Sequence, residues 1–243
     1  FRTFRQYVGE DERIRADVAT ATAILRWLGY LPLGIELVGK YLEARPSVTL
    51  ATLWQRLQDK RLDARALKDL PEERVYEYNI RAALELSWQD LSPLAQQVAG
   101  LLSVFALAPI LKPWIEVALP EIDDEDLEDA LDGELVRGSV VQCLESGRYQ
   151  LHQLVREFLH DHLHTTLADH AEPLQQGMAT ALTAQAKTVP PTVTLNDLVR
   201  MSDAVPHLTV VAEQFSSLVP DDDAAWPFVA LARLAEAQSR WQE

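Results

Sequence analysis

Cysteine is almost absent from this sequence, since Cys143 is the only thiol among its 243 residues. A single thiol cannot form an internal disulfide, so nothing indicates an oxidising compartment, and we expect a cytoplasmic protein. The apolar neighbours Val140, Val141 and Leu144 favour an inert thiol in the core. A nucleophilic cysteine would need a group that stabilises its thiolate, and none is evident.

Long apolar runs and basic residues are also scarce. No run of about 18 apolar residues occurs, which argues against a transmembrane helix. The chain begins at Phe1 without an initiator methionine or a secretory apolar region, so we expect a piece of a longer protein. Lysine and arginine number 22 against 37 acidic residues, a net charge of −15. Such a surface repels phosphate backbones and anionic lipid, so we expect no nucleic-acid and no membrane partner.

The densest acidic run covers residues 121–129. Carboxylates favour the positive end of a helix dipole, so this run is interpreted as a solvated loop followed by a helix N-terminus. Asp126 is a candidate cap for that helix. A site for a basic partner or a metal ion is the alternative interpretation.

Apolar residues recur at helical spacing through most of the first half of the chain. Gly29 is expected to stop the first helix, Thr49 to cap a later one, and Ser92 with Pro93 to start another. Residues 59–74 are charged and lack periodicity, so a linker is predicted there. The predicted helices cover residues 14–28, 33–42, 50–57, 78–88, 94–105, 114–117 and 127–135.

The spacing changes at residue 139. Residues 139–144 alternate as a strand does, residues 145–147 have turn composition, and residues 148–151 are predicted as the returning strand. A helix follows at once, with an apolar face that begins at Leu154. Helices followed by a hairpin and a further helix in this order predict a winged helix.

The remainder is again helical. Val189–Pro191 is expected to end one helix, and Asp221–Asp223 is expected to cap the last one. The predicted fold class is therefore mainly α: a helical domain, a winged helix with one small β-hairpin, and a helical connector. The helices predicted here cover residues 174–182, 195–201, 208–215 and a segment that runs toward Trp241.

Gly34–Lys40 has the spacing G-x-x-x-x-G-K of a phosphate-binding loop. Tyr41 follows where serine or threonine must reach magnesium, and the four intervening residues continue a helical apolar face. We therefore reject a phosphate loop. Because the sequence has no other Gly-Lys pair and no Walker B aspartate, and no catalytic pattern of side chains stands out, it is not expected to be an enzyme.

Three histidines, His160, His162 and His164, lie near the end of a predicted helix. The first and last are four positions apart and share a face, as zinc ligands can. Asp161 stands where a metalloprotease would carry glutamate, and cationic histidine is favourable near a helix C-terminus in any case. No metal site is predicted.

His152 stands where the second hairpin strand turns directly into a helix. A histidine there can direct its ring beyond the helix N-terminus, where anions also bind. A capping or core histidine is the other interpretation.

Four segments resemble the NB-ARC (STAND) signal-transduction ATPases, a family of plant disease-resistance proteins, apoptosome-forming factors and bacterial regulators. Residues 28–37 resemble the family's G-L-P-L-A segment. Residues 83–92 and 102–106 resemble the start of its winged helix and the L-S-V-F sequence that follows. Residues 149–159 are similar to the Y-x-L-H-x-L segment that closes the winged helix. The resemblance covers about residues 1–165.

The resemblance implies a nucleotide switch. A P-loop domain upstream binds ADP or ATP, Pro32 packs on adenine, and His152 contacts the β-phosphate of ADP. ADP holds the closed form, and exchange for ATP releases the winged helix. No nucleotide is expected on this chain alone. Plant members place Met and Asp around the histidine where Leu151 and Gln153 stand here, so a role of the aspartate does not carry over.

Downstream, residues 228–241 fit the first helix of a tetratricopeptide repeat. The implied partners are the protein's own P-loop domain, proteins bound through the repeats, and further copies when the switch is active. The predicted domains are a helical domain at 1–72, a winged helix at 73–166, a connector at 167–220 and the start of the repeats at 221–243. A winged-helix transcriptional regulator that binds DNA is the alternative function.

Overall fold

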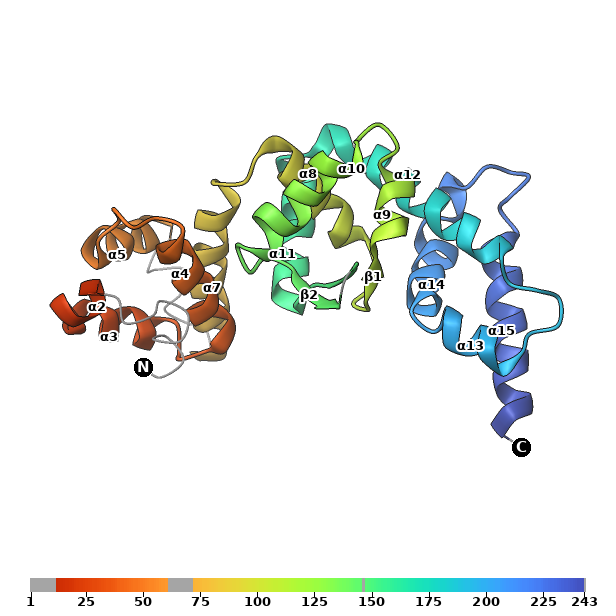
Figure 1. The fold of residues 1–243 in the computed structure, drawn as a ribbon, viewed down its shortest axis with the longest axis horizontal. Helices are drawn as coiled ribbons and strands as arrows, with labels where there is room; N and C mark the ends of the chain where they lie inside the picture. The colour runs from red at the N-terminus through yellow and green to blue at the C-terminus, as the bar shows by residue number, and fades with distance from the viewer. Residues whose placement is uncertain (1–11, 61–71, 146, 243) are drawn as a thin grey trace. The chain divides into compact units, whose positions relative to one another are not determined.

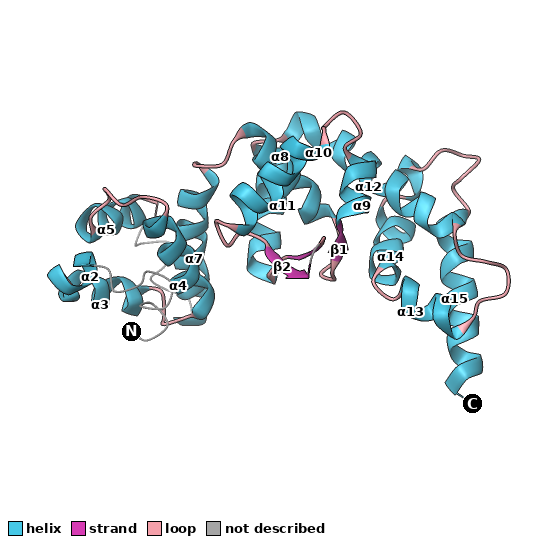
Figure 2. Ribbon diagram, in the orientation of Figure 1, coloured by secondary structure: helices cyan, strands magenta, loops and turns pink. Residues whose placement is uncertain are grey.

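The computed structural model describes residues 12–60, 72–145 and 147–242 and is mainly helical, as Figure 2 shows. Two compact units divide the chain: residues 1–96 with 132–140, and residues 97–131 with 141–243. The predicted fold class is confirmed, because one small antiparallel sheet accompanies the helices. Within the described residues, no helix combines the length and the apolar character needed to cross a membrane.

The first unit is built from helices that surround a leucine-rich core (Figure 1). α4 and α5 both contact α7, and α3 contacts α5. Asp17 caps α3 and Thr49 caps α5, each accepting a backbone N–H with its side chain, as predicted for Thr49. The helices are α2 (Glu12–Ala16), α3 (Val18–Trp27), α4 (Pro32–Glu43), α5 (Leu50–Asp59) and α7 (Glu72–Trp88).

The predicted linker at residues 59–74 is wrong at both ends. Asp59 is the last residue of α5, and α7 begins at Glu72. Residues 61–71 lie outside the described residues. A charged helical end without apolar periodicity has the same composition as a linker, so composition alone could not separate them.

The helix α8 (Pro93–Val104) begins as the Ser92–Pro93 pair predicts. The hydroxyl of Ser92 accepts from the Ala95 N–H at 3.1 Å and donates to Glu134 at 2.6 Å. Glu134 lies in the π-helix η1 (Asp129–Val136), which continues α10 (Asp124–Glu128). The cap of α10 is Asp123 and not Asp126, because the helix begins three residues earlier than predicted.

The small sheet of the second unit has the order β1-β3-β2, with all neighbours antiparallel. The predicted hairpin is present as β2 (Gln142–Glu145) and β3 (Arg148–Gln150). β1 (Ile110–Leu111) pairs with β3 and was not predicted. It leads into α9 (Lys112–Ala118).

The thiol of Cys143 is exposed, so its predicted place in the core is wrong. β2 is an edge strand, and all its residues are exposed, whereas the preceding Val140 and Val141 are buried. The Sγ of Cys143 donates to the Glu145 carbonyl at 3.1 Å. The apolar neighbours of Cys143 in the sequence suggested a buried side chain, but its strand lies at the exposed edge of the sheet.

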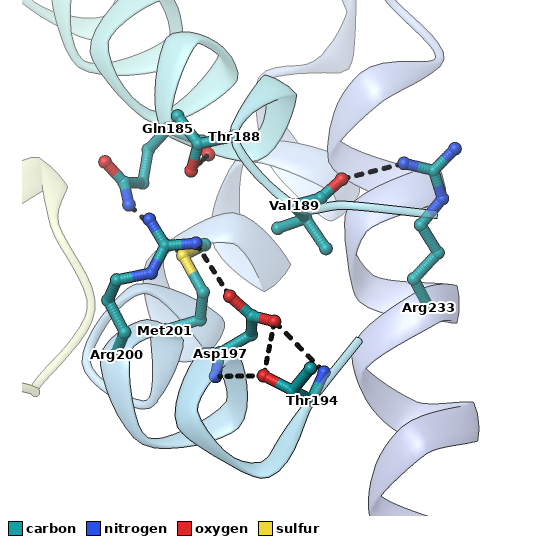
Figure 3. A network of polar contacts seen from close by, with 8 residues as sticks. All are labelled: Gln185, Thr188, Val189, Thr194, Asp197, Arg200, Met201 and Arg233. Atoms are coloured by element: carbon teal, nitrogen blue, oxygen red, sulfur yellow. Dashed lines mark hydrogen bonds and ion pairs between the residues drawn. The ribbon is translucent and has the colours of Figure 1, made fainter. Parts of the chain in front are cut away.

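The rest of the second unit is helical: α11 (Gln153–Thr165), α12 (Ala168–Lys187), α13 (Leu195–Met201), α14 (Ala204–Gln214), a short 3-10 turn (Ser216–Leu218) and α15 (Trp226–Gln242). Thr194 and Asp197 form a capping box at the start of α13 (Figure 3). Arg233 of α15 donates to the Val189 carbonyl at 2.8 Å, which fixes the segment after α12. The predicted domain boundaries at 72, 166 and 220 stay predictions.

Candidate functional site

Pro32 is the first residue of α4, where a missing N–H costs nothing and the fixed φ of proline suits a helix. The turn before it carries two left-handed residues, Gly29 with φ +63° and Tyr30 with φ 57°. A Cβ at Gly29 would lie 2.7 Å from the ring of Tyr76, so only glycine fits there. Tyr30, Leu31 and Pro32 are all exposed. The turn therefore presents an apolar surface that could meet a flat ring.

Asn79 of α7 holds the end of α3, just before this turn. It is 2% exposed, and its Nδ2 donates to the Trp27 carbonyl at 2.6 Å. Trp27 itself packs edge-on against Trp54, with ring centroids 5.8 Å apart. Asn79 leaves no local signal in the sequence, because its partner lies 52 positions away.

Gly34–Lys40 lies inside α4, and both of its glycines are buried. A Cβ at Gly34 would approach the Leu28 side chain to 3.0 Å. Gly34 thus serves close packing in the first unit, and the helical backbone expected for this segment is present.

His152 is the N-cap of α11, with extended backbone at φ −71° and ψ 145°. Its Nδ1 accepts from the Leu154 N–H at 3.2 Å. An accepting Nδ1 carries no proton, so the N–H of this ring is on Nε2. The side chain is exposed, whereas Tyr149 and Leu151 just before it are buried and anchor the junction. The arrangement offers an N–H donor beside the positive end of a helix dipole, which suits an anion.

Pro32 belongs to the first unit and His152 to the second. His152 is both capping and exposed, so the two interpretations from the sequence are compatible. A capping Nδ1 leaves Nε2 available for a ligand.

His160 and His164 share one face of α11, and their Nε2 atoms are 3.4 Å apart. Burial lowers the pKa of His160, and the neighbouring His164 and Arg156 lower it further, while Asp161 raises it. The ring of His162 instead contacts Phe158, with centroids 4.5 Å apart and planes tilted by 58°. No cluster of three or more metal-ligating side chains occurs among the described residues.

His207 of α14 is fully buried and was not singled out from the sequence. Its Nδ1 accepts from the Ala106 N–H and its Nε2 donates to the Pro109 carbonyl, both at 3.0 Å. The ring also packs edge-on against Phe105 and Trp114. It thereby fixes the segment between α8 and β1 to α14. Both ring nitrogens are occupied, so this histidine is structural.

A cavity of about 300 Å³ lies in the first unit between α4, residues 87–91 and residues 133–140. Three basic and three acidic side chains line it. Lys40 pairs with Glu43, and Arg45 pairs with Asp90. The charges balance, so the cavity selects neither an anion nor a cation. The lining charges are Lys40, Arg45, Arg137, Glu43, Asp90 and Glu134.

Comparison with known proteins places this chain beside bacterial regulators. No family model matches the sequence. It is 29% identical over 176 residues to the regulatory protein AfsR of Streptomyces coelicolor, which is 72% of this chain and 17% of that protein. It is 33% identical over 153 residues to AfsR of Streptomyces griseus, which is 63% of this chain and 15% of that protein. The chain thus spans less than a fifth of the length of these relatives and is similar, over most of its own length, to two bacterial regulatory proteins.

Proposed function

We propose that this chain is the regulatory part of a cytoplasmic bacterial signal-transduction protein that switches with its bound nucleotide, in the manner of the NB-ARC family. A P-loop domain of the same protein holds ADP, and the helical domain and winged helix close over it. The chain performs no chemistry of its own. Exchange of ADP for ATP opens the protein, which then assembles and engages protein partners through repeats.

The exposed Nε2–H of His152 at the N-terminus of α11 carries this proposal. A β-phosphate oxygen at that point would accept from Nε2 and also meet the positive end of the helix. The exposed apolar turn at Pro32 supports an adenine contact in the first unit. The similarity to two regulatory proteins supports a bacterial signal-transduction regulator as the broader class.

DNA binding receives less support from the same region. Arg148 is the basic residue of the wing, and it pairs with Asp203 at 2.7 Å and with Glu145 at 3.6 Å. The acidic residues of α10 and the net charge of −15 also oppose a phosphate backbone.

The proposal is tested by ADP release from a protein that contains these residues together with its P-loop domain. His152→Asn keeps a side chain that caps helices well but is too short to present an N–H where Nε2 lies. We expect both His152→Asn and His152→Ala to release ADP about 10- to 100-fold faster, because a charge-assisted hydrogen bond contributes about 1.5–3 kcal/mol.

Gln153→Ala is the matched control, since Gln153 is exposed and its side chain donates to Glu157 of the same helix at 3.0 Å. Its ADP release should equal that of the wild type. If His152→Asn releases ADP at the wild-type rate, the ring does not contact the nucleotide and the proposal fails.

A further inference from the structure

The exposed face of α11 brings two imidazoles together. His160 is half-buried and His164 is exposed, and their rings lie 4.5 Å apart between centroids, with planes at 63°. Neither ring caps the helix, whereas His152 and His207 both bond to backbone groups. The contact between the rings of His160 and His164 is a hydrogen bond from one Nε2–H to the other Nε2, and an ion that both nitrogens ligate would replace its proton.

The separation of the two nitrogens matches a tetrahedral zinc ion. Zinc binds imidazole nitrogen at about 2.0–2.1 Å, so two ligands at a tetrahedral angle have nitrogens about 3.3 Å apart. The Nε2 atoms of His160 and His164 are 3.4 Å apart. Two ligands at the right angle of a square-planar copper(II) site would lie about 2.9 Å apart for the same bond length. The observed spacing favours the tetrahedral ion.

We propose that His160 and His164 bind one zinc ion through their Nε2 atoms, with water in the two remaining positions. Small rotations about the broad χ2 torsion of histidine direct both lone pairs at a common point. The aspartate at 161 excludes the metalloprotease motif but does not exclude a bound ion. The site is independent of the proposed nucleotide switch.

Two charged side chains act on His160, and the like charge acts more strongly. Arg156 acts on His160 with a like charge, and Asp161 acts with the opposite one. The guanidinium of Arg156 is turned toward the protein, since its Nε donates to the Phe105 carbonyl at 2.8 Å. Asp161 therefore offsets part of the repulsion between Arg156 and a divalent ion on this face.

Calorimetric titration of the 243-residue chain with zinc chloride tests the proposal. All proteins carry Cys143→Ser, because that thiol is exposed and would compete for zinc. We expect one zinc ion per chain. His160→Gln or His164→Gln should each weaken the affinity by about 100-fold, since losing even an outer-shell partner of a zinc ligand costs about 10- to 100-fold.

His162→Gln is the matched control, because it removes a histidine of the same helix whose ring packs on Phe158 and whose Nδ1 lies 3.1 Å from the Thr166 hydroxyl. Its zinc affinity should equal that of the parent. Zinc should also raise the melting temperature of the parent and of His162→Gln, but not that of His160→Gln or His164→Gln.

Melting without zinc shows that each variant is folded. A parent chain that takes up no zinc, or a His162→Gln chain that loses as much affinity as the other two, would overturn the proposal.

Discussion

The junction between β3 and α11 and the packing of α14 each contain one histidine, and the two histidines are used in opposite ways. His152 is exposed and gives one nitrogen to its own helix. His207 is fully buried, and both of its ring nitrogens bond to a segment about a hundred positions away. The difference teaches that the number of occupied ring nitrogens, together with burial, separates a structural histidine from one that is available to a ligand.

The largest expected loss of stability follows from a substitution at His207. His207→Ala removes the partner of the partly buried Ala106 N–H and Pro109 carbonyl and opens a cavity beside Phe105 and Trp114. A buried group left unpaired costs about 1–3 kcal/mol, and the cavity adds to it. We expect a loss of about 4 kcal/mol, which lowers the melting temperature of the second unit by about 10 °C.

Differential scanning calorimetry of the 243-residue chain measures this change. His170→Ala is the control, because His170 is exposed and near the start of α12. Its melting temperature should stay at the wild-type value. A His207→Ala chain that melts with the control would show that the two backbone bonds are dispensable.

A second, smaller effect is the loss of folding stability at acid pH. Burial lowers the pKa of His207 below its ordinary 6.5, while the Pro109 carbonyl and Asp203 raise it and Arg156 lowers it. The unfolded chain therefore binds a proton at pH values where the folded chain does not. The stability contributed by the neutral ring is complete above pH 6.5 and is lost as the pH falls from 6.5 toward the lower folded pKa, by up to about 1.4 kcal/mol per pH unit.

Urea unfolding between pH 7.5 and 5 measures this dependence. His207→Gln cannot titrate, so its free energy of unfolding should fall less steeply than that of the wild type across this range. Parallel curves for the two proteins would mean that the folded chain accepts the proton on His207 without loss.

The sequence predicted the helices and the hairpin but not the side chains that join distant segments. Alternation over residues 139–151 was long enough to indicate two strands. Ile110–Leu111 is too short to alternate, so β1 is defined only by its pairing with Tyr149 and Arg148. Among several carboxylates in the acidic run, composition could not show that Asp123 caps α10.

The candidate residues were predictable to different degrees for the same reason. His152 and Pro32 stand at helix starts, and a helix start leaves a local signal. Asn79 and His207 leave none, because their partners are 52 and about a hundred positions away. The place of Cys143 was wrong because edge position in a sheet depends on which strand pairs with which.

The smallest expected loss of stability follows from a substitution at His152. A missing N-cap costs about 0.5–2 kcal/mol, and this one is exposed, with a single bond of 3.2 Å to the Leu154 N–H. His152→Ala should therefore lower the melting temperature of this chain in the absence of nucleotide by only about 2–4 °C. His152→Asn should restore it, because asparagine is among the best capping residues.

Calorimetry on the three proteins, beside His207→Ala, measures the contrast between the two histidines. A drop at His152→Ala as large as that at His207→Ala would make His152 structural. Its exposed nitrogen would then no longer distinguish it, because the fold itself would depend on the ring. A small drop that asparagine reverses leaves Nε2 as the one part of the ring that the folded chain does not use, and that nitrogen is the atom a phosphate would meet.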